Sequence, residues 1–267
     1  MSSWFRRTID LDHQRWEVVD RARSPYGILL VVERRDVTGL RMRRLMDGVL
    51  IQNTYAPETK QSLSVFTGGL TGLARVYTPR IQRALVIGLG AGIVPRQLAG
   101  DGAEVDVVEI NPAVVELARG YFDFDPAAMN TMEVCDGLEY LTHSTGGYDT
   151  IVLDAFQGED SPPHLTEPEA LRRFQKCLQP DGTLVINRFG EFSAKRRMLT
   201  RELHRELIDV FGIESVRLHA SGQGNVFFVA SPRSKMEPCH LPDFSDEHPT
   251  IRFELQLAWE GVRPPPE

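Results

Sequence analysis

The sequence has few cysteines, no long apolar run and no excess of positive charge. Its three cysteines, Cys135, Cys177 and Cys239, lie far apart and form no CxxC pair, which fits a reducing compartment and argues against a cysteine zinc site. No apolar stretch approaches the roughly 18 residues that a membrane span needs. The two N-terminal arginines precede no apolar core of a signal peptide. We therefore expect a cytoplasmic protein with no metal cofactor and no membrane partner.

Acidic residues outnumber basic ones. The chain has 37 Asp and Glu residues against 30 Lys and Arg, which gives a formal net charge of −7. Such a chain has no overall positive field that would attract nucleic acid phosphates. Basic residues do gather in residues 191–211, but Glu and Asp are interspersed with them, as is typical of a solvated helix face. A nucleic acid partner is not expected.

The 267 residues, 42% of them hydrophobic, suffice for one sizeable domain and a smaller appendage. Short β-prone runs separated by turns predict a small antiparallel β-module over residues 1–60. Apolar residues over 62–77 have helical spacing, although three glycines weaken that prediction. The segment 232–267 is rich in proline and charge, and we expect it to be extended or disordered.

Between these segments, strands and helices alternate. The predicted strands are 84–89, 104–110, 131–135, 148–156, 183–188, 213–219 and 224–231. Such alternation indicates an α/β, Rossmann-like domain over residues 61–231, with a mostly parallel seven-stranded sheet and an antiparallel edge. Two helix starts carry capping signals: Asn111 precedes Pro112, and Thr166 with Glu169 fits a capping box.

The first strand of this domain runs into a glycine-rich turn with Gly88, Gly90 and Gly92. Glycines let the backbone approach a ligand closely, and the following helix offers free N–H groups. A tight turn without a ligand would have the same sequence. The next strand ends at Glu109, 21 positions after Gly88, where a carboxylate that accepts the ribose hydroxyls is expected.

Asp136 and Gly137 follow the third strand, where a carboxylate can accept a hydrogen bond from an adenine amino group or cap a helix. A dinucleotide site usually carries GxGxxG, whereas this chain has Ile93 in place of the last glycine. The pattern therefore favours an adenosyl sulfonium ligand of the S-adenosylmethionine type within residues 84–187.

The chain resembles the spermidine synthase family, within the class I S-adenosylmethionine-dependent methyltransferase superfamily, over about residues 15–230. The motifs that carry the resemblance are Asp47-Gly48-Val49-Leu50-Ile51-Gln52, Leu85 to Gly92, Val108-Glu109-Ile110-Asn111-Pro112, Tyr121-Phe122, Asp136-Gly137 and Tyr148 to Asp154. Most of them are shared with the superfamily, and the β-module ending in DGVLIQ narrows the resemblance.

The resemblance implies a cleft between the two domains for decarboxylated S-adenosylmethionine and an amine. It implies that Gln52 and Glu109 contact the nucleoside and that Asp136 contacts the adenine. Asp154 would orient and deprotonate the attacking amine. Independently, Asp154 ends a predicted parallel strand, where open α/β sheets bind ligands, although it could also cap a loop. The resemblance is compatible with a homodimer.

The chain departs from the family at the substrate end. Where the family usually has aspartates, this chain has Ala91 in the glycine-rich loop and Gln157 three places after Asp154. Gln61 stands where an aromatic residue is usual. A polyamine needs carboxylates and aromatic faces. Glu159 and Asp160 are candidates to supply the carboxylates, and a solvated acidic loop is an equally good interpretation of them.

Three hypotheses follow. The leading one is transfer of an aminopropyl group from decarboxylated S-adenosylmethionine to a small-molecule di- or polyamine. The alternative is an S-adenosylmethionine-dependent methyltransferase with an unidentified acceptor, which the missing acidic residues favour. The third is a catalytically silent binding module. His164 invites a catalytic role, but packing or helix capping is the favoured interpretation.

Overall fold

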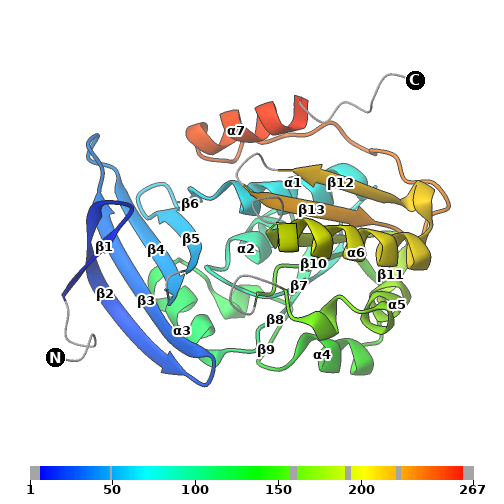
Figure 1. Cartoon of the computed structure of the whole chain (residues 1–267), viewed down its shortest axis with the longest axis horizontal. Helices are drawn as coiled ribbons and strands as arrows, with labels where there is room; N and C mark the ends of the chain where they lie inside the picture. The colour runs from blue at the N-terminus through cyan, green and yellow to red at the C-terminus, as the bar shows by residue number, and fades with distance from the viewer. Residues whose placement is uncertain (1–6, 49, 157–160, 190–193, 221–223, 261–267) are drawn as a thin grey trace.

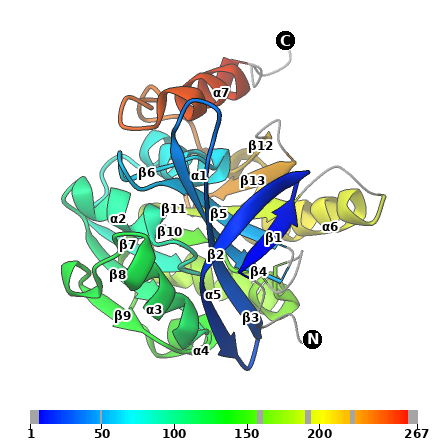
Figure 2. The same cartoon turned by 90° about the vertical axis from the view of Figure 1, so that its left-hand side faces the viewer.

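The computed structural model describes residues 7–48, 50–156, 161–189, 194–220 and 224–260. Its N-terminal part is a six-stranded antiparallel sheet in which each strand pairs with the next along the chain (Figures 1 and 2). The strands are β1 (Thr8–Leu11), β2 (Gln14–Ser24), β3 (Gly27–Arg35), β4 (Arg41–Asp47), β5 (Leu50–Ala56) and β6 (Gln61–Ser62). The antiparallel β-module predicted from the sequence is confirmed.

Two hairpins of this sheet position residues that matter below. Ser24 pairs with Gly27 across the β2–β3 turn, and Asp47 pairs with Leu50 across the β4–β5 turn. Gly27 has φ +135°, which L side chains rarely adopt. Both turns lie at the same end of the sheet, because the β3–β4 register pairs Leu29 with Asp47.

The second sheet has seven strands in the order β12-β13-β11-β10-β7-β8-β9. The strands are β7 (Arg83–Ile87), β8 (Glu104–Val108), β9 (Thr131–Glu133), β10 (Tyr148–Leu153), β11 (Leu178–Phe189), β12 (Val216–Ala220) and β13 (Asn225–Ala230). All pairs are parallel except those made by β13 with β11 and β12. The Rossmann-like fold with an antiparallel edge is thus confirmed.

Helices cover both faces of this sheet (Figure 1). Within β7, Ala84 and Val86 join one buried cluster with α1 (Val65–Tyr77), α2 (Ile93–Gly100) and α3 (Pro112–Tyr121). Leu85 and Ile87 join the other cluster, with α4 (Gly137–His143), α5 (Pro168–Cys177) and α6 (Ala194–Phe211). This alternation explains why the strands are apolar throughout, since each face is buried.

The C-terminal segment was expected to be extended or disordered, but it contains helix α7 (Pro249–Glu260), which packs on α1. The reason lies in the α1 glycines. A Cβ at Gly68 would lie 2.7 Å from Leu255, and one at Gly72 would lie 2.6 Å from the Phe244 ring. The glycines that weakened the helix prediction therefore allow the C-terminal segment to dock closely.

One capping prediction is confirmed and the other is wrong. The Asn111 side chain accepts a hydrogen bond from the Ala113 N–H at 3.1 Å, at the start of α3. Helix α5, in contrast, has Glu167 at its N-cap with no side-chain cap. Thr166 donates its hydroxyl to the Pro163 carbonyl instead, because the 3-10 turn Pro163–Leu165 precedes the helix directly.

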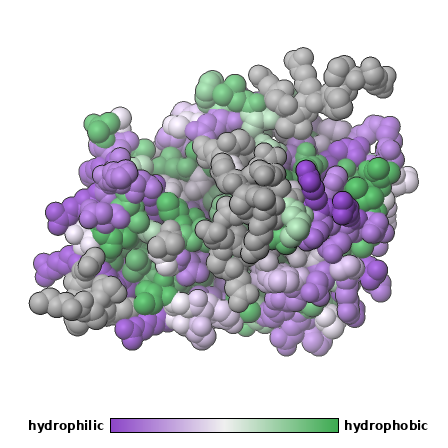
Figure 3. All heavy atoms as spheres, in the orientation of Figure 1, coloured by the Kyte–Doolittle hydropathy of each residue, from purple (hydrophilic) through white to green (hydrophobic). Residues whose placement is uncertain are grey.

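On the face seen in Figure 3, hydrophilic residues predominate and apolar residues form separate groups among them. Among the described residues, none of the helices combines the length and the apolar character that crossing a membrane requires.

Candidate active site

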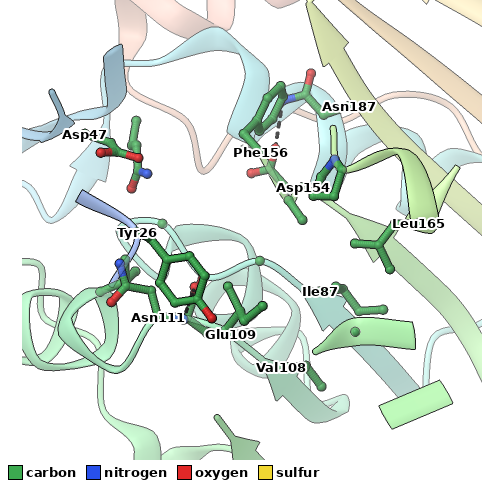
Figure 4. A pocket seen from close by; sticks show the side chains of 18 of the residues that line it. Tyr26, Asp47, Ile87, Val108, Glu109, Asn111, Asp154, Phe156, Leu165 and Asn187 are labelled. Atoms are coloured by element: carbon green, nitrogen blue, oxygen red, sulfur yellow. Dashed lines mark hydrogen bonds between the residues drawn. The ribbon is translucent and has the colours of Figure 1, made fainter. Parts of the chain in front are cut away.

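A cavity of about 420 Å³ lies between the N-terminal sheet and the carboxyl ends of β7, β8 and β10 (Figure 4). Its size is that of a small-molecule site, and its position is where open α/β sheets bind ligands. Of the predicted site residues, those that line it are Gln52, Gly88, Gly90, Glu109, Asp136, Gly137 and Asp154. The fold thus brings together residues that are spread over about a hundred positions of sequence.

Gly88, Gly90 and Gly92 of the glycine-rich loop occupy their positions for different structural reasons. A Cβ at Gly88 would lie 2.4 Å from the Asp154 carbonyl oxygen, so only glycine fits between β7 and β10 there. A Cβ at Gly90 would meet nothing within 4 Å, which leaves this residue open to a ligand. Gly92 does not line the cavity. It caps α2 with φ 72°, and a Cβ there would meet the Phe124 ring at 2.7 Å, so packing explains this glycine.

Glu109 follows β8 and is held by the backbone. Its two carboxylate oxygens accept hydrogen bonds from the Leu89 and Asn111 N–H groups, each at 2.8 Å. Burial raises the pKa of Glu109 above its ordinary value, while these backbone bonds oppose the rise. The carboxylate is therefore fixed between the glycine-rich loop and α3, and its remaining lone pairs can accept hydroxyl groups of a ligand.

Asp154 follows β10 and is held by side chains from two neighbouring strands. Asn187 of β11 donates to Asp154 at 2.8 Å, and Asn225 of β13 donates to Asn187 at 3.0 Å. Burial, opposed by the Asn187 bond and assisted by the charge of Glu109, raises the pKa of Asp154 to about 7. The result is an oriented carboxylate that can take up a proton near neutral pH.

Asp136 is the N-cap of α4, so the helix-cap interpretation of this residue applies. One of its oxygens accepts the Leu138 and Glu139 N–H groups at 2.9 and 3.1 Å. The other lies 2.8 Å from the Nε2 atom of His164. Burial raises the pKa of Asp136, but the bonds from His164 and from the backbone outweigh it and leave the pKa below its ordinary value. His164 is thus a partner of Asp136 at the cavity wall.

Gln52 carries a buried side-chain oxygen for which the described residues provide no hydrogen-bond partner. Because a buried acceptor without a donor is costly, a ligand with a hydroxyl or amino group would fit beside it. Phe156 and Phe189 pack against each other in the cavity lining, with ring centroids 5.1 Å apart. From the sequence, these two residues and Met46 were expected to be core or cleft wall; the phenylalanines form the wall, and Met46 is buried in the core of the N-terminal sheet.

Apart from His164, which is paired with Asp136, the titratable groups with a charge in the described lining are carboxylates. Asp47, Glu109, Asp136 and Asp154 line the cavity, and the described lining residues include no Lys or Arg. A cavity with several carboxylates attracts cations and disfavours anionic ligands. In the described part of the chain, no group of three or more His, Cys, Asp and Glu side chains is arranged to hold a metal ion.

Three lining residues, Tyr26, Asn187 and Asn225, have no role predicted from the sequence. Asn187 carries a usable signal, because it is a polar residue at the end of an apolar parallel strand, beside Asp154 in the sheet order. Asn225 begins an antiparallel strand whose pairing partner cannot be read from periodicity. Tyr26 lies in a turn, where a single aromatic residue has no pattern.

The departures from the family have structural counterparts. Ala91 is buried and does not line the cavity, and the Gln61 amide donates to the Asp246 carbonyl at 2.8 Å. Neither position supplies a charge or an aromatic face to the site. Gln157, Glu159 and Asp160 lie outside the described residues.

Comparisons with known proteins agree with this geometry. The model of the spermine/spermidine synthase domain matches residues 65–215, more than half of the chain. The chain is 38% identical over 126 residues to a polyamine aminopropyltransferase of Vibrio vulnificus, a match covering 45% of this chain and 42% of that protein. It is 28% identical over 137 residues to a human eEF1A lysine and N-terminal methyltransferase, covering 44% of this chain and 20% of that protein.

Among solved structures, a probable spermidine synthase from Corynebacterium glutamicum has a TM-score of 0.69 at 19% identity, covering 89% of this chain and 87% of that one. This likeness concerns the fold. The matches to the first two curated relatives span only about two fifths of their length. The domain match over residues 65–215 includes the glycine-rich loop, Glu109, Asp136 and Asp154, and the chain belongs to the spermine/spermidine synthase family.

Proposed function

We propose that the chain transfers an aminopropyl group from decarboxylated S-adenosylmethionine to a di- or polyamine. The observation that carries this proposal is a cavity lined by four carboxylates and by no described Lys or Arg, with Asp154 poised near neutral pH. Both substrates are cations: the donor has a sulfonium and an ammonium, and the acceptor has ammonium groups. Names of curated relatives support the same activity.

The donor has residues that fit it. Glu109 would accept the ribose hydroxyls, because backbone bonds already fix its carboxylate. The free Gln52 oxygen would accept a further donor of the nucleoside. Gly88 and Gly90 give the backbone room to approach the ligand. Asp136 would face the adenine amino group, although α4 and His164 already occupy part of its acceptor capacity.

The reaction is a displacement at the carbon beside the donor's sulfonium. The amine lone pair forms the new C–N bond, the C–S bond breaks, and its electron pair stays on sulfur as a neutral thioether. An ammonium has no lone pair, so the attacking nitrogen must first lose a proton, and Asp154 would accept it. A carboxylate with a pKa of about 7 is a better acceptor than an ordinary aspartate, and Asn187 keeps it oriented.

A methyltransferase using S-adenosylmethionine is the second candidate. Two observations favour it: Ala91 provides no carboxylate for the ammonium of an aminopropyl donor, and a human methyltransferase is among the relatives. The lining disfavours it, because the described part of the cavity wall has no Lys or Arg for the donor's carboxylate.

Calorimetric titration of the purified protein with S-adenosylmethionine and with its decarboxylated form, each with and without 1,4-diaminobutane or spermidine, tests the proposal. Preference for the decarboxylated form, strengthened by the amine and followed by formation of an aminopropylated product, is the expected result. Tighter binding of S-adenosylmethionine would replace aminopropyl transfer by methyl transfer. Binding of a donor without turnover would support the third hypothesis, a catalytically silent binding module. A homodimer and a cytoplasmic location stay predictions.

A further inference from the structure

Three of the four carboxylates in the cavity already have hydrogen-bond partners. Backbone N–H groups hold Glu109, the α4 backbone and His164 hold Asp136, and Asn187 holds Asp154. Asp47 differs from them. Burial raises its pKa, and within the described part of the chain no hydrogen bond or basic side chain opposes that rise. A partly buried carboxylate without a donor is a suitable place for a cationic ligand.

The surroundings of Asp47 fix its position. Asp47 ends β4, beside the turn where β2 and β3 meet, and one carboxylate oxygen would lie 3.2 Å from a Cβ at Gly27. Glycine at position 27 therefore lets this carboxylate approach the turn. Tyr26, next to Gly27 in the turn, lines the same cavity, and about half of its side chain is exposed. Its aromatic face is a second group in the cavity that can contact an alkylammonium ion.

Asp47 and Asp154 lie on opposite sides of the cavity (Figure 4). The nitrogen that reacts must be near Asp154, so a second, unreactive ammonium needs a counter-ion elsewhere. Given the proposed function, on which this inference rests, we propose that Asp47, assisted by Tyr26, binds an ammonium group of a substrate that is not the attacking nitrogen. The ammonium belongs either to the distal end of the acceptor or to the three-carbon arm of the donor.

Matched ligand pairs test this assignment in Asp47→Asn. The acceptor pair is 1,4-diaminobutane and butylamine, which lacks the second ammonium, each titrated in the presence of 5′-methylthioadenosine. The donor pair is decarboxylated S-adenosylmethionine and its analogue with an S-propyl group in place of the aminopropyl group, which keeps the sulfonium charge but lacks the ammonium. In one of the two pairs, we expect the variant to bind the ligand with the extra ammonium about 10- to 100-fold more weakly than the wild type does. The ligand of that pair without the ammonium should bind equally well to both proteins. The pair that is affected shows whether the ammonium at Asp47 belongs to the acceptor or to the donor.

Asp10→Asn is the control, since Asp10 is an exposed carboxylate on β1 of the same sheet and does not line the cavity. This control variant should bind all four ligands with the affinities of the wild type. Thermal melting checks the fold of Asp47→Asn, which loses a partly buried, unpaired charge and should melt no lower than the wild type. Equal affinities of wild type and Asp47→Asn for all four ligands would overturn the assignment while leaving the proposed function standing. A wild type that binds neither donor nor diamine would overturn both.

Discussion

Asp154 joins two properties that rarely coincide in an exposed aspartate: a fixed orientation and a pKa of about 7. The orientation comes from amide side chains on adjacent strands, and the pKa comes mainly from burial. Both depend on the strand order of the sheet. The position of Asp154 at a strand end could be predicted from its sequence, because the preceding strand is apolar throughout. Its partner Asn187 carries a weaker signal, as a polar residue at the end of another apolar strand. Asn225, which orients Asn187, could not be predicted, because the pairing of its strand cannot be read from periodicity.

Replacing Asp154 by Asn should lower turnover by about 10²–10⁴-fold, because the amide cannot accept the amine proton. Its oxygen can still accept the Asn187 hydrogen bond, so the fold and the affinity for 5′-methylthioadenosine should persist. Steady-state kinetics combined with calorimetry separate the two effects. Unchanged turnover would remove Asp154 as the base.

The same substitution should change how stability depends on pH. The folded-state pKa of Asp154 is raised to about 7, so the folded protein binds a proton more tightly than the unfolded chain does. Stability is therefore lost as pH rises from about 4 to 7. The variant Asp154→Asn should not show this loss, and its free energy of unfolding at pH 8 should exceed that of the wild type by up to about 4 kcal/mol. Denaturant unfolding at pH 5 and pH 8 measures the difference, and equal pH slopes in the two proteins would contradict the raised pKa.

Asn187→Leu should move the rising limb of the pH–rate profile to higher pH. The Asn187 hydrogen bond favours the charged form of Asp154, so its loss raises that pKa further. Turnover at pH 7 should fall about 10- to 100-fold, with partial recovery at pH 9. Asn130→Leu is a matched control, because Asn130 donates to the buried Asp106 away from the cavity. A uniform loss without a shift of the profile would mean that Asn187 is only structural.

At the scale of elements, α1 contains glycines that helix propensity disfavours. Sequence periodicity indicates the helix, and the close approach of Phe244 and Leu255 explains the glycines afterwards. Helix α7 was missed for the same reason: its stability depends on docking against α1, and local composition carries no sign of that contact. The strands of the larger sheet were easier to predict, because burial on both faces leaves an unbroken apolar run.

Gly72→Ala should destabilise the protein by about 1–3 kcal/mol, although alanine is the better helix former. The new methyl group would meet the Phe244 ring at 2.6 Å. Gly120→Ala in α3 is the control, because a Cβ there meets nothing within 4 Å. That variant should gain roughly 0.5–1 kcal/mol. Chemical denaturation of both variants measures the contrast, and a stabilised Gly72→Ala would contradict the docking.

At the scale of the whole molecule, the cavity needs both sheets. The position of the N-terminal β-module over the strand ends was predicted from the resemblance to a family. Sequence periodicity could not predict it, because periodicity does not report how two sheets are oriented relative to each other. The C-terminal segment packs on α1, on the side away from the larger sheet's core. Its Glu247 is buried and accepts a hydrogen bond from Gln97 at 2.6 Å, which in turn accepts one from Thr71 of α1.

Ending the chain after Ser231 should therefore lower stability by at least about 3 kcal/mol, because it uncovers the apolar surface of α1 and removes Phe244, Ile251 and Leu255. Leu241→Ala is the control, because this side chain of the same segment is 90% exposed, and it should change the melting temperature little. Differential scanning calorimetry of the shortened chain, of Leu241→Ala and of the wild type makes the comparison. Equal melting temperatures of the shortened chain and the wild type would show that the docked C-terminal segment adds no stability.

The contact of Gly88 with the Asp154 carbonyl also bears on how such a protein can diverge. The proposed donor site and the proposed base are joined by backbone hydrogen bonds, in which the Asp154 N–H donates to Ile87 and the Gly88 N–H donates to Val108. A side chain at position 88 would displace both at once, so this half of the site tolerates little change. Tyr26 and Asp47 belong to hairpins of a separate sheet. If the proposed roles hold, substitutions in those hairpins can change the preferred acceptor without disturbing the donor site.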